Sequence, residues 1–184
     1  MENEIYEPRE DSFLLEKYAK KLSRGVALDI GTGSGIQAKA ALEKADFVIG
    51  ADINKKVIDF CRKNNDSEKL IFIKSDLFSF FETSEQQIKF DTIIFNPPYL
   101  PDDKNKDIAL DGGKYGYEVI ERFLKEAKKF LKNDGLILLI LSSFSKKEKI
   151  DSIIKENDFK KEELEKVHIS FEDIYCYKIT DFLS

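Results

Sequence analysis

The chain has 184 residues, which is enough for one well-buried core and too few for two comfortable domains. Its 35 acidic residues outnumber its 30 lysines and arginines, and the formal charge of −5 argues against a general nucleic-acid binder, which normally carries a clear basic face. No apolar run approaches the ~20 residues that span a bilayer, and the acidic start of the chain is not followed by the apolar core of a secretory signal. We therefore expect a cytoplasmic protein with a single domain over residues 1–184.

The two cysteines indicate neither a metal site nor a disulfide framework. Cys61 and Cys176 lie far apart in the sequence and lack metal-ligand spacing, which predicts reduced thiols in a cytoplasmic protein. A segment starting at Asp103 begins like a calcium-binding loop, but Ile108 stands where that loop requires glycine. We expect this segment to be a solvated loop, and we predict no metal ligands.

Helical and β-like apolar patterns alternate along the chain. Apolar residues between 14 and 22 keep helical spacing, and Asp11 or Ser12 is the expected N-cap of this first helix. The other expected helices are 36–44, 55–64, 117–131 and 146–157, with a short helical turn at 76–81 and a tight turn at 133–135. The expected strands are 26–30, 47–51, 70–73, 92–95, 136–141, 163–169 and 174–179.

This alternation predicts an α/β fold with a doubly wound, mostly parallel sheet of seven strands. Residues 170–173 join the last two strands, and this connection is too short for a parallel crossover. We therefore expect an antiparallel C-terminal hairpin at the sheet edge. The arrangement resembles the Rossmann-like fold of class I S-adenosylmethionine-dependent methyltransferases, although a fold does not by itself establish a function.

A glycine-rich turn follows the first expected strand and opens a helix. Its spacing is Asp29-x-Gly31-x-Gly33-x-Gly35, which lets the backbone turn tightly and approach a ligand closely. The dinucleotide fingerprint would require glycine at position 36, where this chain has Ile36. The turn resembles instead the first motif of S-adenosylmethionine-binding methyltransferases.

Acidic residues also follow the next two expected strands. Asp52 is positioned to accept both ribose hydroxyls of a nucleoside cofactor, and Asp76-Leu77 is the usual place for binding the adenine amine and packing its ring. Carboxylates at this site suit a cofactor that carries a sulfonium cation and no pyrophosphate. Each Asp alone could be a helix cap or a strand terminus, but together with the glycine turn they favour a cofactor site.

The strand 92–95 ends at Asn96-Pro97-Pro98-Tyr99. The prolines cannot donate to a sheet and force a rigid exit from the strand. A polar amide and an aromatic ring are thereby placed at the carboxyl end of a buried strand, where ligands bind in open α/β sheets. Taken alone, the stretch fits equally well a proline-bracketed loop in which the asparagine forms a local turn.

With a methyl-donor cofactor, this signature resembles that of enzymes that methylate a planar nitrogen, either the exocyclic amine of a base or a side-chain amide. The Asn96 side-chain oxygen and the Pro97 carbonyl would hold the NH2 group and stabilise the positive charge growing on nitrogen. Tyr99 would pack against the flat face of the acceptor. No general base is required, and we interpret His168, the only histidine, as structural.

Residues 6–13, 96–101 and 111–120 together resemble the HemK/PrmC family, which methylates the glutamine of the Gly-Gly-Gln motif in class 1 translation release factors. The resemblance covers essentially the whole chain. Bacterial members carry an additional N-terminal helical domain, for which this chain has no room. The Tyr-Glu-Pro-x-Glu-Asp-Ser motif so close to residue 1 is similar to the short archaeal and eukaryotic branch.

The resemblance implies the roles of the site residues, although the sequence departs from the family pattern in two places. Asp29 stands where some relatives have Glu, and the loop after Tyr99 lacks the small-residue run of some relatives. Residues 1–24 would form an N-terminal segment and helix over the cofactor site. The implied cofactor-binding residues are Tyr6, Pro8, Ser12, Asp29, Gly31, Thr32, Gly33, Gly35, Asp52, Ile53, Asp76, Leu77 and Asn96, and the implied catalytic residues are Asn96, Pro97, Pro98 and Tyr99.

A small zinc-binding activator subunit is also implied, because members of the short branch work with one. In the usual strand order of this fold, residues 70–73 form an edge strand of four consecutive large apolar residues, which invites strand addition. The alternative is that helices cover both faces of this strand and that Lys69 and Lys74 protect its edge.

Three other functions remain open from the sequence. A DNA or RNA adenine methyltransferase shares the Asn-Pro-Pro-Tyr signature, but such enzymes usually add a target-recognition segment and a basic groove. A protein-lysine methyltransferase would not need the amide-holding Asn96. A catalytically silent binding subunit is of a different class, and the intact glycine turn and Asn96 argue against it.

Overall fold

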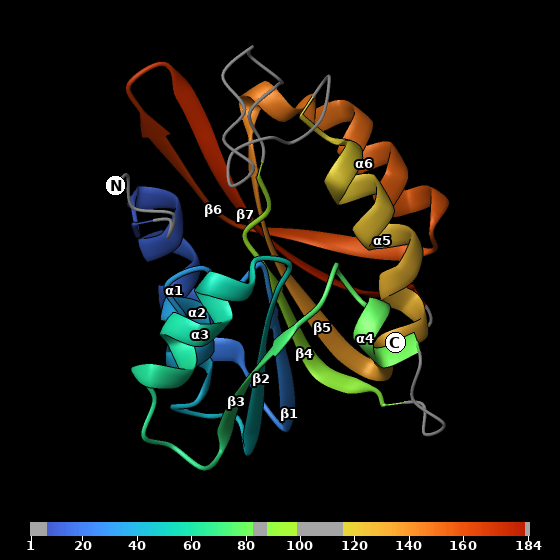
Figure 1. Cartoon of the computed structure of the whole chain (residues 1–184). Helices are drawn as coiled ribbons and strands as arrows, with labels where there is room; N and C mark the ends of the chain where they lie inside the picture. Colours follow the sequence, from blue (N-terminus) through green and yellow to red (C-terminus); the bar gives the residue numbers. More distant parts are fainter. Residues whose placement is uncertain (1–6, 83–87, 99–115, 183–184) are drawn as a thin grey trace.

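The computed structural model describes residues 7–82, 88–98 and 116–182 (Figure 1). Its strands are β1 (Val26–Ile30), β2 (Phe47–Asp52), β3 (Leu70–Lys74), β4 (Phe90–Phe95), β5 (Leu131–Ser142), β6 (Phe159–Ile169) and β7 (Glu172–Asp181). Its helices are α1 (Glu10–Leu22), α2 (Ile36–Ala41), α3 (Lys55–Lys63), α4 (Ser79–Glu82), α5 (Glu118–Phe130) and α6 (Lys147–Glu156), with a 3-10 turn η1 (Ser143–Ser145). Within the described ranges, no helix combines the length and the apolar character needed to cross a membrane.

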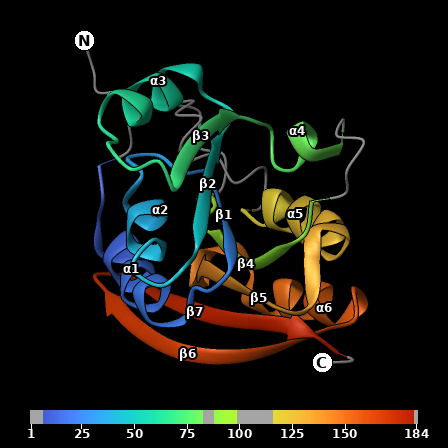
Figure 2. The ribbon, with the colours of Figure 1, turned by 90° about the horizontal axis from the view of Figure 1, so that it is seen from below.

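The strands form one seven-stranded sheet in the order β3-β2-β1-β4-β5-β7-β6. Pairs from β3 to β5 are parallel, whereas β7 runs antiparallel to both β5 and β6. The predicted C-terminal hairpin and the α/β, Rossmann-like fold are therefore confirmed. Figure 2 shows α1, α2 and α3 on one face of the sheet and α4, α5 and α6 on the other. The direction of winding reverses between β1 and β4, so the loops after these two strands lie side by side at the carboxyl edge of the sheet, where ligands bind in such folds.

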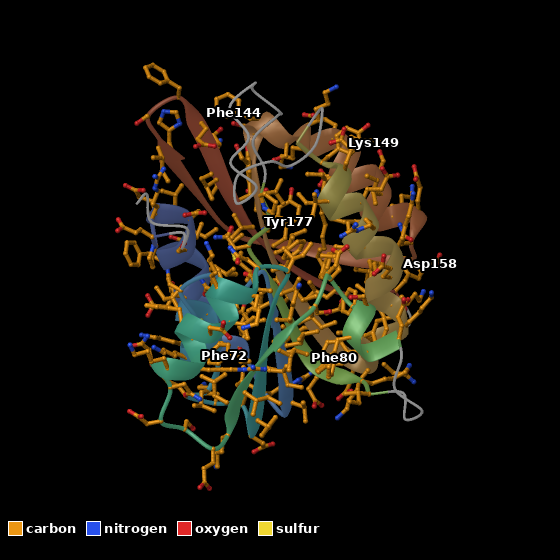
Figure 3. All side chains as sticks on the ribbon, viewed as in Figure 1. Phe72, Phe80, Phe144, Lys149, Asp158 and Tyr177 are labelled. Atoms are coloured by element: carbon orange, nitrogen blue, oxygen red, sulfur yellow. The ribbon has the colours of Figure 1, made fainter. Side chains whose placement is uncertain are left out.

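An apolar core lies on each face of the sheet, because helices cover both faces; this explains the nearly continuous apolar runs of the central strands. On the face of α1, α2 and α3, the side chains of Leu15, Ile58 and Phe72 are buried in one cluster, and Phe72 lies beside α3 (Figure 3). On the opposite face, the rings of Phe78 and Phe130 stack with their centroids 4.6 Å apart. The two cores fix the sheet and so the positions of the loops at its edge.

β5 begins earlier than the sequence predicted, at Leu131 rather than at residue 136. Leu131 pairs with Phe90, but Thr92 pairs with Leu136, so the residues between them on β5 bulge out of the ladder. The expected turn at 133–135 lies inside this bulge. The prediction was wrong about the strand's start because the Leu131 pairing depends on β4, which is distant in sequence.

α1 begins without a side-chain cap. Its N-cap is Arg9, whose side chain forms no capping hydrogen bond, and Asp11 and Ser12 lie inside the first turn. The prediction that one of them caps the helix was therefore wrong. Both side chains are buried at the carboxyl edge of the sheet, where the Ser12 hydroxyl bonds to the Asp11 carboxylate and Asp11 also bonds to Asn96 in the loop after β4.

The middle of α1 is anchored to the C-terminal hairpin. The Tyr18 hydroxyl donates to the Leu164 carbonyl at 3.1 Å and to Glu165 Oε2 at 2.8 Å. The same carboxylate accepts from Lys17 Nζ at 2.6 Å. These contacts join the first helix to β6, which lies at the other end of the sheet order from β3.

β3 is an edge strand, as predicted, and Ile71 at its centre has a relative exposure of 43%. The sequence suggested Lys69 and Lys74 as the residues that would protect this edge, but other side chains bond to it. Arg62 Nε donates to the Phe72 carbonyl at 2.9 Å, and Asn65 Nδ2 donates to the Leu70 carbonyl at 2.7 Å. Side chains from α3 and the turn after it thus occupy two carbonyls of the edge, and they line a shallow pocket along it.

Candidate functional site

The loop after β1 adopts the tight turn that its glycines predicted. Gly31, Gly33 and Gly35 all have positive φ, between 51° and 80°, a region that residues with a side chain rarely adopt. The Gly35 amide donates to the Thr32 carbonyl at 2.8 Å, which closes the turn, and the Thr32 amide donates to the Ala51 carbonyl at 3.0 Å, which ties it to β2. The loop therefore has a fixed shape.

Asp29, near the end of β1, holds this loop from beneath. Its Oδ2 atom accepts from the Thr32 hydroxyl at 2.6 Å and from the Ala38 amide at 3.1 Å, so it links the loop to the start of α2. The side chain is only 1% exposed, and its Oδ1 atom has no hydrogen-bond partner among the described residues. Burial raises the pKa of Asp29 to about 7, although its two hydrogen bonds oppose this rise.

Asp52, at the end of β2, closes the side of the glycine loop. Its carboxylate accepts from the Gly33 amide at 3.1 Å and from the Asn54 amide at 2.8 Å. Burial raises its pKa despite these bonds. The next side chain, Ile53, is 52% exposed, so an apolar surface adjoins the carboxylate at the rim of the site.

The turn after β3 reaches the same edge of the sheet. Leu77 is buried with a φ of +46°, a strained value for a leucine, and the Ser75 hydroxyl donates to its carbonyl at 2.7 Å. Asp76 is exposed, and its carboxylate pairs with Arg122 of α5. The turn is thus positioned as predicted, but the Asp76 carboxylate is engaged by a neighbouring helix.

Asn96 follows β4, directly beside the glycine loop. Its Nδ2 atom donates to Asp11 Oδ2 at 2.9 Å, whereas its Oδ1 atom is buried and has no partner among the described residues. A side chain at Gly31 would come within 3.9 Å of the Asn96 carbonyl oxygen, which shows how closely the two loops approach. Pro97 is buried and Pro98 is half-buried, so the chain leaves the strand along a packed wall.

The first turn of α1 completes this arrangement. The Ser12 hydroxyl donates to Asp11 Oδ1 at 3.3 Å, and Gln37 Nε2 of α2 donates to the Ser12 carbonyl at 2.8 Å. Sequence reasoning missed Asp11 and Gln37 as site residues. Asp11 belongs to the motif that carried the family resemblance but was interpreted as a cap. The signal for Gln37 was a polar residue directly after the glycine turn on a helix that otherwise buries alanines.

The structure thus brings most of the predicted site residues to one edge of the sheet. Pro8 is half-buried just before α1. Tyr6 and Tyr99 lie outside the described residues, as does the segment from Asp103 that resembles a calcium loop. His168 is exposed on the C-terminal hairpin and pairs with Asp173 at 2.8 Å, away from the residues of the site.

A family model described as "Methyltransferase small domain" matches residues 10–171. The chain belongs to this methyltransferase family. A Methanocaldococcus jannaschii protein, named for a proposed protein N5-glutamine methyltransferase activity, is 34% identical over 180 residues, which cover 93% of this chain and 89% of that protein. The release factor glutamine methyltransferase of Fusobacterium nucleatum is 30% identical over 172 residues, which cover 83% of this chain and 48% of that protein. The methyltransferase chain thus spans about half the length of that bacterial relative, and the predicted resemblance to the protein-glutamine methyltransferases is confirmed.

Solved structures share the methyltransferase fold. The E. cuniculi Mtq2-Trm112 complex, described as responsible for methylation of the eRF1 translation termination factor, matches with a TM-score of 0.77 and 24% identity over 97% of this chain and 99% of that chain. M. capricolum TrmK, solved with S-adenosyl-homocysteine, matches with a TM-score of 0.65 and 17% identity over 92% of this chain and 68% of that chain. At these identities the likeness establishes the fold.

Proposed function

We propose that this methyltransferase transfers a methyl group from S-adenosylmethionine to the side-chain amide nitrogen of the glutamine in the Gly-Gly-Gln motif of a class 1 release factor. The observation that carries the proposal is the buried oxygen of Asn96 beside the glycine loop, which has no hydrogen-bond partner among the described residues. The names of the relatives, release factor and protein N5-glutamine methyltransferases, support this acceptor.

The residues present fit an S-adenosyl group. The glycine loop offers a backbone that a ligand can approach closely, and its carboxylates suit a sulfonium cation better than a pyrophosphate. Asp52 would accept the ribose hydroxyls, with the exposed Ile53 and the buried Leu77 against the adenine. Asp76 would accept the adenine amine through Oδ2, because the contact with Arg122 is made by Oδ1. The remaining residues implied by the resemblance are Tyr6, Pro8, Ser12, Asp29, Thr32 and Asn96.

The N-terminal segment, residues 1–24, would cover the cofactor within a single domain over residues 1–184. Two contacts support this placement. Gln37 of α2, just after the glycine loop, bonds to the Ser12 carbonyl, and Asn96 bonds to Asp11. Removal of α1 should therefore weaken both cofactor binding and turnover.

The chemistry follows from the geometry at Asn96. An amide nitrogen is a weak nucleophile because its lone pair is delocalised, and the bound cofactor supplies an electrophilic methyl carbon on sulfur. Asn96 Oδ1 and the Pro97 carbonyl would accept from the two N–H groups of the acceptor, orient its lone pair and stabilise the positive charge that grows on nitrogen. Tyr99 would pack on the flat face of the amide. As the nitrogen–carbon bond forms, the carbon–sulfur bond breaks, and the proton leaves the nitrogen for solvent afterwards.

The test is methyl transfer from labelled S-adenosylmethionine in the presence of a candidate zinc-binding activator. One series offers a class 1 release factor, its Gly-Gly-Gln→Gly-Gly-Ala variant, and duplex and single-stranded nucleic acid. Label on the release factor that disappears with the glutamine is the expected result. Label on nucleic acid would instead make this protein an adenine methyltransferase that uses the same amine-holding site. A release factor substrate would also imply a cytoplasmic location.

The partner is proposed to be a small zinc-binding subunit that adds along β3. The Mtq2-Trm112 complex supports a small partner for a chain of this fold, and Ile71 presents an exposed apolar side chain on the edge strand. A docking strand would have to displace Arg62 and Asn65 from the Phe72 and Leu70 carbonyls.

Ile71→Lys should therefore abolish co-purification of the activator while the protein alone stays folded. Phe171→Lys, at the 92% exposed tip of the C-terminal hairpin, is the matched control and should still bind the activator. Unchanged association of the Ile71 variant would exclude β3 as the docking edge.

A further inference from the structure

The carboxylate of Asp11 is buried between two side chains at the catalytic edge of the sheet. Asp11 is 4% exposed; its Oδ1 accepts from the Ser12 hydroxyl at 3.3 Å and its Oδ2 accepts from Asn96 Nδ2 at 2.9 Å. We propose that Asp11 is a positioning residue, which fixes the Asn96 side chain so that its oxygen alone faces the acceptor amide. This inference rests on the proposed methyl transfer at Asn96.

An asparagine side chain has two ends of similar shape, and only one of them accepts hydrogen bonds. A carboxylate accepts and does not donate, so it can bond to the NH2 end of Asn96 but not to the oxygen end. If the Asn96 amide turned over, its oxygen would lie against Asp11 Oδ2, and two acceptors would face each other at a hydrogen-bonding distance. Asp11 therefore determines which end of Asn96 points toward the acceptor.

The position of Asp11 is itself fixed by its surroundings. It lies in the first turn of α1, where the helix dipole favours a negative charge. The neighbouring Ser12 carbonyl is bonded to Gln37 of α2, the helix that begins directly after the glycine loop. Asn96 is thus oriented by α1, which precedes the glycine loop in sequence. The first turn of α1 bonds both to Asn96 and to α2, the helix that follows the glycine loop.

The orientation of Asn96 also determines the class of acceptor. With its NH2 group bonded to Asp11, Asn96 has its oxygen, a hydrogen-bond acceptor, left for the incoming group. A primary amide or amine, which donates, is matched by this site, whereas a carboxylate or carbonyl oxygen would meet another acceptor.

The first test is Asp11→Asn, which keeps the shape and changes the hydrogen bonding. If the oxygen of the introduced amide accepts from Ser12, its NH2 group faces Asn96 and stabilises the reversed orientation of that side chain. We expect kcat to fall roughly tenfold, which corresponds to about 1.4 kcal/mol, with the Kd for S-adenosylmethionine little changed. Asp46→Asn removes the same charge from an exposed turn and is the matched control. A kcat for the Asp11 variant equal to that of the control would overturn the proposal.

The reciprocal exchange separates positioning from a merely structural role. Asn96→Asp alone places two carboxylates against each other and should inactivate the protein. Adding Asp11→Asn restores a matched pair, since the amide introduced on α1 donates to one oxygen of the carboxylate introduced after β4 and leaves the other oxygen as an acceptor. The double variant should therefore be more active than Asn96→Asp alone, although Asp11→Asn is harmful by itself. Equal or lower activity of the double variant contradicts the inference.

The bond between Asp11 and Asn96 can also be tested by NMR without any methyl acceptor, so a failure of this inference can be told apart from a failure of the proposed function. The side-chain NH2 resonances of Asn96, assigned by their loss in Asn96→Ala, should lie downfield in the full chain with its activator, as expected for a bond to a carboxylate. They should move upfield in Asp11→Asn and stay in place in Asp46→Asn. If the wild-type chain fails to methylate a release factor, the proposed acceptor is wrong. If the Asn96 NH2 chemical shifts stay unchanged in Asp11→Asn, the positioning role is contradicted.

Discussion

The loops after β1 and β4 are neighbours at one edge of the sheet, yet their polar atoms are used in opposite ways. In the first, Asp29 and Asp52 accept hydrogen bonds from the hydroxyl and an amide of the loop and from an amide of α2. In the second, Asn96 donates its NH2 group to Asp11 and keeps its oxygen without a partner among the described residues. The polar atoms of the first loop hold its shape, whereas the second loop keeps an acceptor atom for the proposed reaction. Variants in each loop should therefore fail differently.

The largest effect on methyl transfer is expected for Asn96→Ala. Removing a preorganised hydrogen-bonding group at a reacting atom typically costs about 100- to 1,000-fold in kcat, and we expect a loss of that order. The Kd for S-adenosylmethionine, measured by calorimetry, should change by only a few fold, because the alanine leaves the glycine loop intact. A large loss of cofactor affinity would instead make cofactor binding, and not orientation of the acceptor, the main role of Asn96.

A smaller and different effect is expected for Asp52→Ala. Hydrogen bonds to a charged group contribute about 1.5–3 kcal/mol each, so the Kd for S-adenosylmethionine should rise by roughly 10- to 100-fold. At saturating cofactor, kcat should stay close to that of the wild type. The same calorimetric titration provides the check, and an unchanged Kd would contradict the ribose assignment.

Asp29→Asn should have the smallest effect on turnover and should alter stability instead. Its oxygen can still accept from Thr32 and Ala38, so the loop should keep its shape. In the wild type, burial raises the pKa of Asp29 from 3.8 to about 7. The folded state therefore retains a proton that the unfolded chain has released, and this stabilisation is lost as the pH rises from about 4 to about 7. The free energy of unfolding, measured in urea at about pH 5 and about pH 8, should fall less for the variant than for the wild type. An equal fall in both proteins would mean that Asp29 is ionised in the folded state.

The sheet and the position of the site could be predicted from the sequence because both depend on local patterns. Apolar runs mark the strands, the short connection at 170–173 requires a hairpin, and the carboxyl ends of parallel strands meet at one edge. The location of Asp29, Asp52 and Asn96 at this site could be predicted because each lies near or just after the carboxyl end of a strand.

The hydrogen-bond partners could not be predicted in the same way. Asp11 and Asn96 are 85 positions apart, and Asp76 and Arg122 are 46 positions apart. Whether Asp11 caps its own helix or bonds to a distant loop depends on how α1 packs on the sheet, which no local pattern records. The β5 bulge was missed for the same reason, since its register is set by β4.

Tyr18 and its bonding partners on β6 are 146 and 147 positions apart in the chain. During synthesis α1 leaves the ribosome long before β6, so its hydroxyl has no partner there until the hairpin has emerged. Contacts over such separations also carry a large loop-closure entropy, which slows folding. Because α1 carries the carboxylate that orients Asn96, we expect the reactive geometry to be among the last parts of the molecule to form.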